Sequence, residues 1–162
     1  MKRFLIGFFI GGVLGGLLGV AVTIFVYPFI FLNDIVAAET LQSAEGRTLV
    51  AEGTFIHASP SDPVHYGMGK VSVFNDTVRL EPDFLVGPGP KYKVLLHTAK
   101  GIRKTDDVTA ARYIDLGGLR AFKGSQRYSI PAGVDLKNYP SVVIWCERFS
   151  VLISPADLSP AR

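Results

Sequence analysis

Cysteine and tryptophan are almost absent from this sequence of 162 residues, which holds one of each, Cys146 and Trp145, side by side. A single cysteine cannot form an internal disulfide, so the chain is not a small scaffold stapled by disulfides. In an exported chain, an unpaired thiol is a buried hydrophobic residue, an intermolecular linker or a reactive group. The sequence leaves these three possibilities open.

The motifs of several common enzyme classes are also absent. The sequence has no Gly-x-Ser-x-Gly nucleophile turn, no phosphate-binding loop, no dinucleotide fingerprint and no calcium loop. We therefore do not expect hydrolytic or transfer catalysis.

Charged residues are missing from Phe4 to Leu32, a run of about 29 residues. As a helix this run would extend about 43 Å, which exceeds the hydrocarbon core of a bilayer at about 30 Å. The apolar part of a cleavable signal is shorter, about 7–15 residues. We therefore expect residues 1–32 to be an uncleaved signal anchor held by membrane lipid. Cleavage of a signal at the small residues of Val36–Glu39 is the alternative.

The basic residues around this run predict its orientation. Lys2 and Arg3 precede it, and the next basic residue is Arg47. By the positive-inside rule, the protein crosses the cytoplasmic membrane once with its N-terminus inside, and its domain faces the periplasm or the cell exterior. The remaining 15 basic residues nearly balance the 14 acidic ones. Net charge therefore gives no reason to expect a nucleic-acid partner.

Four glycines, Gly7, Gly11, Gly15 and Gly19, recur at every fourth position of the anchor. Residues four apart share one face of a helix, and such a face allows another helix to approach closely. This predicts a homo-oligomer formed in the membrane. The alternative is that glycine is simply common in membrane helices.

After residue 46 the sequence shows no long helical pattern. Short runs rich in Val, Ile, Tyr and Phe alternate with Gly, Pro, Asn and Asp, which is typical of strands and turns. We expect residues 33–46 to be a linker, with a possible helical extension, and residues 47–162 to be an antiparallel β-sandwich or barrel. Asn75-Asp76 is expected to turn a hairpin, and Asp135 to cap one helical turn before Pro140. The charged stretch 100–107 is expected to be a solvated loop.

Histidine is scarce, with three residues, and its spacing argues against a metal centre. His57, His65, His97 and Cys146 are ligand types that suit electron-transfer copper, but no His or Met follows Cys146. His57 and His65 are separated by two prolines, which is no local zinc spacing. We therefore expect no metal, copper or haem cofactor. His65 is expected to fix a loop by hydrogen bonding, and His97 to be solvated at a strand end.

Several segments of the exported part resemble the DM-thirteen domain family, a small β-module of extracellular and membrane proteins. The opening "GTFIHASPSDPVHYGMGKVSV" carries His65 and Gly69 at the places of the family's histidine and glycine. "GPKYKVLL" resembles its Gly-Pro segment, with Lys91 in place of the usual acidic residue. The strongest part is "YIDLGGLRAFKGSQRYSIPAGVDLKNYPSVVIWCERFSVLISPADL", which holds the Asp-Leu-Gly, Tyr-x-Ile-Pro, Val-Asp-Leu and Ile-Trp-Cys elements in order.

This resemblance implies a compact β-fold and a proposed role in electron transfer, because the module accompanies haem-binding and b-type cytochrome domains. The redox proposal for the family rests on the cysteine of the Ile-Trp-Cys element, here Cys146. We therefore take Cys146, Trp145 and His65 as redox candidates in a membrane-tethered accessory module with an envelope protein or redox partner. The alternative is a structural or adhesive module that binds an envelope protein or glycan, with Cys146 inert in the core.

The residues around Cys146 add an expectation about its surroundings. Alternation along "SVVIWC" puts Val142, Ile144 and Cys146 on one face and Val143 and Trp145 on the other. Both faces are apolar, which predicts a central strand. Charged residues follow directly, so we expect partial solvent access to the thiol. A nearby arginine would then favour the thiolate.

Overall fold

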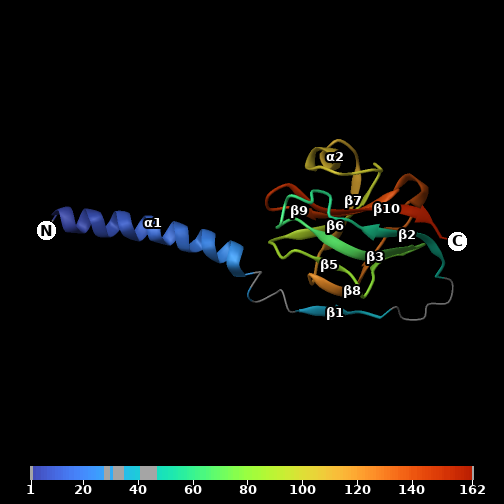
Figure 1. The fold of residues 1–162 in the computed structure, drawn as a ribbon, viewed down its shortest axis with the longest axis horizontal. Helices are drawn as coiled ribbons and strands as arrows, with labels where there is room; N and C mark the ends of the chain where they lie inside the picture. The colour runs from blue at the N-terminus through green and yellow to red at the C-terminus, as the bar shows by residue number, and fades with distance from the viewer. Residues whose placement is uncertain (1, 28–29, 31–34, 41–46, 162) are drawn as a thin grey trace.

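The computed structural model describes residues 2–27, 30, 35–40 and 47–161, and in it one long helix leads to a domain built of strands (Figure 1). The helix is α1 (Lys2–Tyr27). The strands are β1 (Val36–Ala38), β2 (Leu49–Phe55), β3 (Gly67–Phe74), β4 (Thr77–Leu80), β5 (Leu85–Val86), β6 (Tyr92–His97), β7 (Tyr113–Gly118), β8 (Lys123–Ser129), β9 (Ser141–Cys146) and β10 (Val151–Pro160). The domain also contains α2 (Thr105–Thr109) and a 3-10 turn (Leu136–Asn138). The predicted fold class, mainly β after one N-terminal helix, is confirmed.

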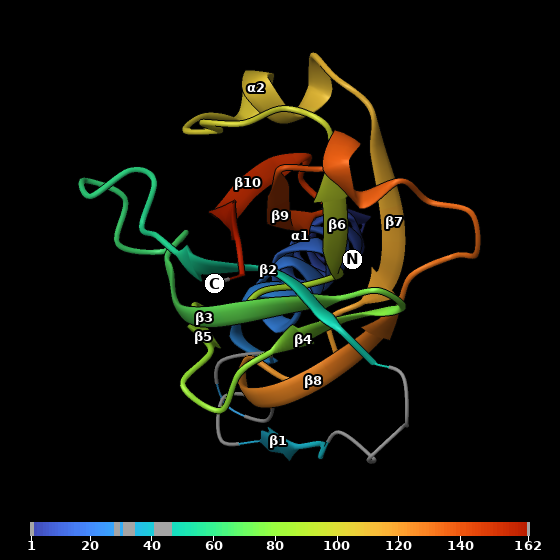
Figure 2. The same ribbon diagram turned by 90° about the vertical axis from the view of Figure 1, so that its right-hand side faces the viewer.

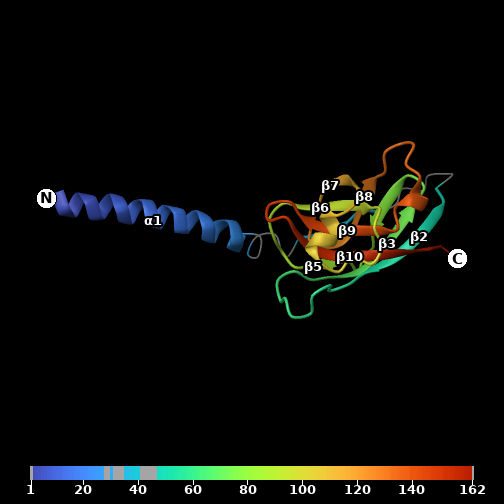
Figure 3. The same cartoon turned by 90° about the horizontal axis from the view of Figure 1, so that it is seen from above.

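Helix α1 is long and apolar enough to cross a membrane. Its segment Lys2–Ile24 has a mean hydropathy of 2.3, and none of it is buried against the rest of the protein. The Thr23 hydroxyl donates to the Gly19 carbonyl at 2.8 Å, which satisfies that side chain within the helix. The helix points away from the domain along the long axis of the molecule (Figure 3). The orientation of the helix in the membrane stays a prediction.

The strands form one mixed sheet that curls around a central core. Its order is β1-β8-β4-β3-β2-β10-β9-β6-β7, and β5 pairs with both β3 and β8. Figure 2, which looks along the length of the molecule, shows these strands arranged in a ring. The ring brings β7 and β8 together, and the Tyr128 hydroxyl donates to the Gly118 carbonyl at 3.5 Å. No β7–β8 ladder is present among the described residues, so the ring is an open barrel.

Two local predictions within the barrel are confirmed. Strands β3 and β4 form the expected hairpin, with Val73 opposite Val78 and Asn75-Asp76 between the strands. The Asp135 carboxylate accepts the backbone N–H of Lys137, and the 3-10 turn that it caps ends before β9 begins. Both follow from short-range chemistry, in which Asn and Asp satisfy nearby backbone groups at turns and helix starts.

Strand β9 separates two hydrophobic clusters, because all six of its residues are buried and successive side chains point to opposite faces. Val142, Ile144 and Cys146 belong to the cluster inside the barrel. Val143 and Trp145 belong to a second cluster outside it, which is completed by Leu95, Ile102, Val108 and Leu152. The predicted alternation and the predicted central position, between β6 and β10, are confirmed.

The second cluster corrects the expectation for residues 100–107. These residues are not simply a solvated loop, because Ile102 is fully buried and α2 begins at Thr105. Ile102, which precedes α2, and Val108 within α2 share a cluster with Trp145 and cover the outer face of the sheet. The charged residues that surround Ile102 hide this apolar contact in the sequence.

Residues 35–40, within the expected linker, contain a strand rather than a helical extension; residues 33–34 and 41–46 lie outside the described part. Strand β1 pairs in parallel with β8, so that Val36 lies opposite Lys123. Next to it, the Glu39 carboxylate accepts two hydrogen bonds from the Arg120 guanidinium, at 2.8 and 2.9 Å, and one from the Arg127 backbone N–H at 3.0 Å. Burial opposes ionisation of Glu39, but these hydrogen bonds outweigh it and hold the pKa of the carboxyl below its usual value.

Gly124 allows β1 to approach β8 this closely. A Cβ atom at this position would lie 2.1 Å from the Ala37 carbonyl oxygen and 2.9 Å from a methyl carbon of Val36. Gly124 also has a φ of +85°, which a residue with a side chain rarely adopts. Only glycine satisfies both requirements, so the docking of β1 depends on it.

We predict that Gly124→Ala releases β1 from the barrel. The matched control is Gly133→Ala, since Gly133 has a similar φ of +82° but no atom within 4 Å of the added Cβ. Both variants should lose about 1–2 kcal/mol to backbone strain. Gly124→Ala should lose at least about 1 kcal/mol more, because backbone hydrogen bonds between β1 and β8 break. Urea unfolding and amide hydrogen exchange at residues 36–39 measure this difference; equal losses with protected β1 amides would contradict it.

Candidate functional site

Cys146 ends β9 and is sealed inside the barrel. It is 1% exposed, and its S–H donates to the Pro90 carbonyl oxygen with Sγ and O separated by 3.2 Å. Burial raises the pKa of the thiol; hydrogen bonds from the backbone N–H groups of Phe149 and Arg148 offset only part of this effect. The expected partial access is therefore wrong, and Arg148 does not make the thiolate the favoured form.

Tyr92 is the direct neighbour of Cys146 on the adjacent strand. The two residues lie opposite each other in the antiparallel β6–β9 ladder, with both side chains in the inner cluster. The Tyr92 ring packs edge-on against Phe122, with ring centroids 5.7 Å apart. Burial raises the pKa of the Tyr92 hydroxyl, and the negative charges that Cys146 and Tyr66 would carry raise it further. Tyrosine and cysteine thus form a buried, protonated pair.

His65 reaches the same place from the loop between β2 and β3. A cavity of about 30 Å³, enough for about one water molecule, lies beside the thiol. Its lining residues are Val64, His65, Pro88, Gly89, Pro90, Tyr92, Cys146 and Phe149. The structure therefore brings together two of the three redox candidates, Cys146 and His65.

The orientation of His65 is fixed by Asp62. The His65 Nδ1 atom lies 2.6 Å from the Asp62 carboxylate, which also accepts the backbone N–H groups of Val64 and His65. The side-chain hydrogen bond from His65 is the main reason that the pKa of Asp62 is lowered to about 2. The backbone carbonyl of Asp62 lies 2.7 Å from His57 Nε2. The expectation that His65 fixes a loop by hydrogen bonding is confirmed.

Trp145 and His97 lie elsewhere. Trp145 points to the outer face of β9, into the cluster under α2, and so does not line the cavity at Cys146. His97 is fully buried, which overturns the expectation that it is solvated. Its Nδ1 accepts the Ala99 backbone N–H at 2.9 Å and its Nε2 donates to the Val108 carbonyl at 2.9 Å. These bonds use both ring nitrogens to hold the segment that carries α2.

No group of three or more His, Cys, Asp or Glu side chains is arranged to hold a metal ion in the described part of the chain. The two histidines near Asp62 and the buried His97 belong to separate hydrogen-bond networks. The sequence alone does not identify Tyr92 as the partner of Cys146. The alternation of "KYKVLL" shows that Tyr92 points inward, but the pairing of β6 with β9 is a long-range contact that this pattern does not reveal.

The fold and the site together define a class of protein: an open β-barrel module with one sealed thiol, carried behind a helix of membrane-spanning length. The model of the family Electron transfer DM13 matches residues 60–158, which is more than half of the chain and includes the whole site. The chain therefore belongs to this family. No curated protein and no solved structure matches it.

We predict that Cys146 of the folded protein reacts with a thiol reagent such as a maleimide only when the barrel opens locally. The rate should be at least about 100-fold below that of the urea-unfolded chain, because opening a buried strand end costs about 3 kcal/mol or more. Intact mass measured over time gives the rate. Modification at the unfolded rate would show that the thiol is accessible in solution.

Proposed function

We propose that the protein is a membrane-tethered accessory module of electron transfer, displayed on the outer side of a cytoplasmic membrane, with Cys146 as its redox-relevant residue. Membership of the electron-transfer family supports the reaction class. A spanning α1 with Lys2 and Arg3 before it supports the tether and its orientation. The observation that carries the proposal is the buried Cys146–Tyr92 pair, which shares a cavity with the partly exposed His65 at one end of the barrel.

The position of this pair supports a partner in the same membrane. The turn after β9 and the loop before β6 lie at the end of the barrel nearest α1 (Figures 1 and 3). Residues of that loop and of the start of β6, from Gly89 to Lys93, also line a cleft with the last turn of α1. A redox partner embedded in the bilayer would therefore meet the Cys146 end of the module first.

The sealed thiol limits what Cys146 does in this role. A thiol that is 1% exposed with a raised pKa is protected from disulfide exchange, which needs an accessible thiolate. A lone thiol is also a poor electron carrier without a cofactor. In the proposal, the partner supplies the redox group and the Cys146 end of the barrel supplies the contact and the local environment.

The test is the rate at which intact cells reduce a membrane-impermeant acceptor such as ferricyanide. Cys146→Ser should lower the part of this rate that depends on the protein by at least about tenfold. Trp145→Phe is the matched control, because Trp145 is the chain neighbour of Cys146 but faces the outer cluster. This variant should keep the rate. Thermal unfolding and a second variant, Cys146→Ala, separate a fold defect from a lost function. A folded Cys146→Ser protein that supports the full rate would end the redox proposal.

A second candidate, a non-catalytic module that binds an envelope protein or a glycan, is favoured by a separate observation. A polar cleft of about 760 Å³ lies across β2, β3 and β10. Its polar lining residues include Glu52, Ser72, Glu81, Asp83, Asp157 and Ser159. Under this reading Cys146 is a packing residue, and full activity of Cys146→Ser in every assay would support it.

We also propose that α1 self-associates through the face formed by Gly7, Gly11, Gly15 and Gly19. Apart from the chain neighbours and the nearby backbone of the helix itself, no described atom lies within 4 Å of a Cβ placed at any of them, so the face is open to another helix. Gly11→Leu combined with Gly15→Leu should abolish cross-linking between copies in the membrane, and Val13→Leu is the matched control. Unchanged cross-linking of the double variant would contradict self-association.

A further inference from the structure

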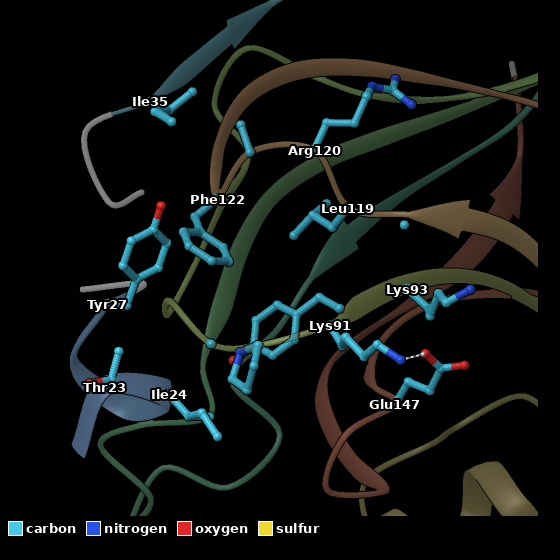
Figure 4. Close-up of a pocket in the computed structure, with 15 residues that line it drawn as sticks. Thr23, Ile24, Tyr27, Ile35, Lys91, Lys93, Leu119, Arg120, Phe122 and Glu147 are labelled. Atoms are coloured by element: carbon cyan, nitrogen blue, oxygen red, sulfur yellow. Dashed lines mark ion pairs between the residues drawn. The ribbon is translucent and has the colours of Figure 1, made fainter. Parts of the chain in front are cut away.

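A cleft of about 710 Å³ lies between the last turn of α1 and the near end of the barrel. Figure 4 shows Thr23, Ile24 and Tyr27 of α1 on one side of it, with residues of the barrel on the other. Its volume falls within the range of small-molecule sites, about 300–1,000 Å³. This cleft is distinct from the cavity of about 30 Å³ at the thiol.

The helical wall of the cleft lies where α1 leaves the membrane. The candidate span is Lys2–Ile24, so Ile24 is its last residue and Tyr27 follows at the level where tyrosine is enriched, the boundary with the headgroups. A molecule dissolved in the bilayer would reach this cleft by moving sideways along α1, without crossing water.

Strand β1 holds one lining residue of the cleft next to the barrel. Ile35, which lines the cleft, directly precedes β1, and β1 is clamped to β8 by backbone pairing and by the Glu39–Arg120 ion pair. Arg120 lines the cleft as well and lies 4.5 Å above the centre of the Tyr128 ring. The barrel side of the cleft, from Ile35 to Arg120, is therefore held in place by strand pairing and an ion pair.

Apolar and aromatic side chains supply much of the wall, while the cations at the rim are already paired. Ile24, Ile35, Leu119 and Phe122 are among the lining residues. The lining cations are held by carboxylates: Lys91 by Glu147 at 3.5 Å, Lys93 by Asp115 at 2.8 Å and Arg120 by Glu39 at 2.8 Å. With no surplus of positive charge, the cleft fits an uncharged ring better than an anionic lipid headgroup. The ammonium and guanidinium N–H groups remain donors for carbonyl oxygens on such a ring.

The cleft and the thiol cavity share a wall. Gly89, Pro90 and Tyr92 line both, and Pro90 also accepts the hydrogen bond from Cys146. A ring in the cleft would be separated from the thiol by little more than the Tyr92 side chain and the Pro90 backbone.

We propose that this cleft binds the ring of a membrane-dissolved quinone. An uncharged ring with two carbonyl acceptors and an isoprenoid tail matches the apolar walls, the compensated charges and the approach from the bilayer. The inference deepens the proposed function, on which it rests, by naming the class of molecule that meets the Cys146 end of the barrel.

The test is photolabelling of the full chain in phosphatidylcholine nanodiscs with an azido-quinone that carries a short isoprenoid tail. Labels should appear on peptides that contain residues 87–93 or 118–122, and excess decyl-quinone should suppress them. Ile35→Glu should reduce labelling at least about fivefold, because its carboxylate would have to be desolvated when the ring binds. Ile35 is 47% exposed, so this change should not disturb folding; Leu119→Glu tests the barrel wall independently.

Val50→Glu is the matched control, since Val50 is an exposed aliphatic residue outside the cleft and should keep full labelling. Equal labelling of the Ile35→Glu, Leu119→Glu and control proteins would overturn the inference. A second outcome would also overturn it: a diazirine phospholipid labels the same peptides, and decyl-quinone does not suppress the labelling. That result would assign the cleft to a lipid acyl chain.

Cys146→Ser separates this inference from the proposed function, because the thiol does not line the cleft and the variant should keep quinone labelling. Lost acceptor reduction in Cys146→Ser with no quinone labelling of the unaltered chain would overturn the inference and leave the proposed function standing. Specific quinone labelling of the unaltered chain, together with full acceptor reduction in Cys146→Ser, would support quinone binding and overturn the redox role of Cys146.

Discussion

The burial of β9 on both faces is the constraint on which the rest of the domain depends. Six consecutive residues of this strand are buried between β6 and β10, so each face must be covered by other elements. The barrel covers one face, and α2 with its preceding loop covers the other. The same constraint assigns the neighbours Trp145 and Cys146 to different environments, because adjacent side chains of a strand point in opposite directions.

The chemistry near the thiol follows from this arrangement. Pairing of β6 with β9 sets Tyr92 opposite Cys146, and burial favours the protonated form of both side chains. His65 approaches from a loop whose shape is set by hydrogen bonds to Asp62. The site thus places two protonated side chains, Tyr92 and Cys146, in the interior of the barrel, with His65 and its partner Asp62 at the edge. A buried thiol with a raised pKa is poorly suited to thiol exchange in water.

Short-range patterns in the sequence predict much of the fold. Alternation along "SVVIWC" is enough to assign each side chain of β9 to a face, because that alternation is a property of any strand. The Asn75-Asp76 turn and the Asp135 cap are readable for the same reason. Docking of β1 is not readable, because it depends on Gly124 and Arg120, which are distant in the sequence. The burial of His97 is equally hidden, since its partner is the Val108 carbonyl, a group that every residue carries.

The clamp formed by β1 has a consequence for how the module meets other proteins. With Glu39 bound to Arg120 and Arg127, residues 35–40 lie along β8 and do not add to the reach of the chain between α1 and the barrel. The shorter the chain between an anchor and its domain, the smaller the volume that the domain can sample around the anchor. For an anchor that lies in a bilayer, a shorter reach raises the effective concentration of the domain for proteins beside it in the same bilayer.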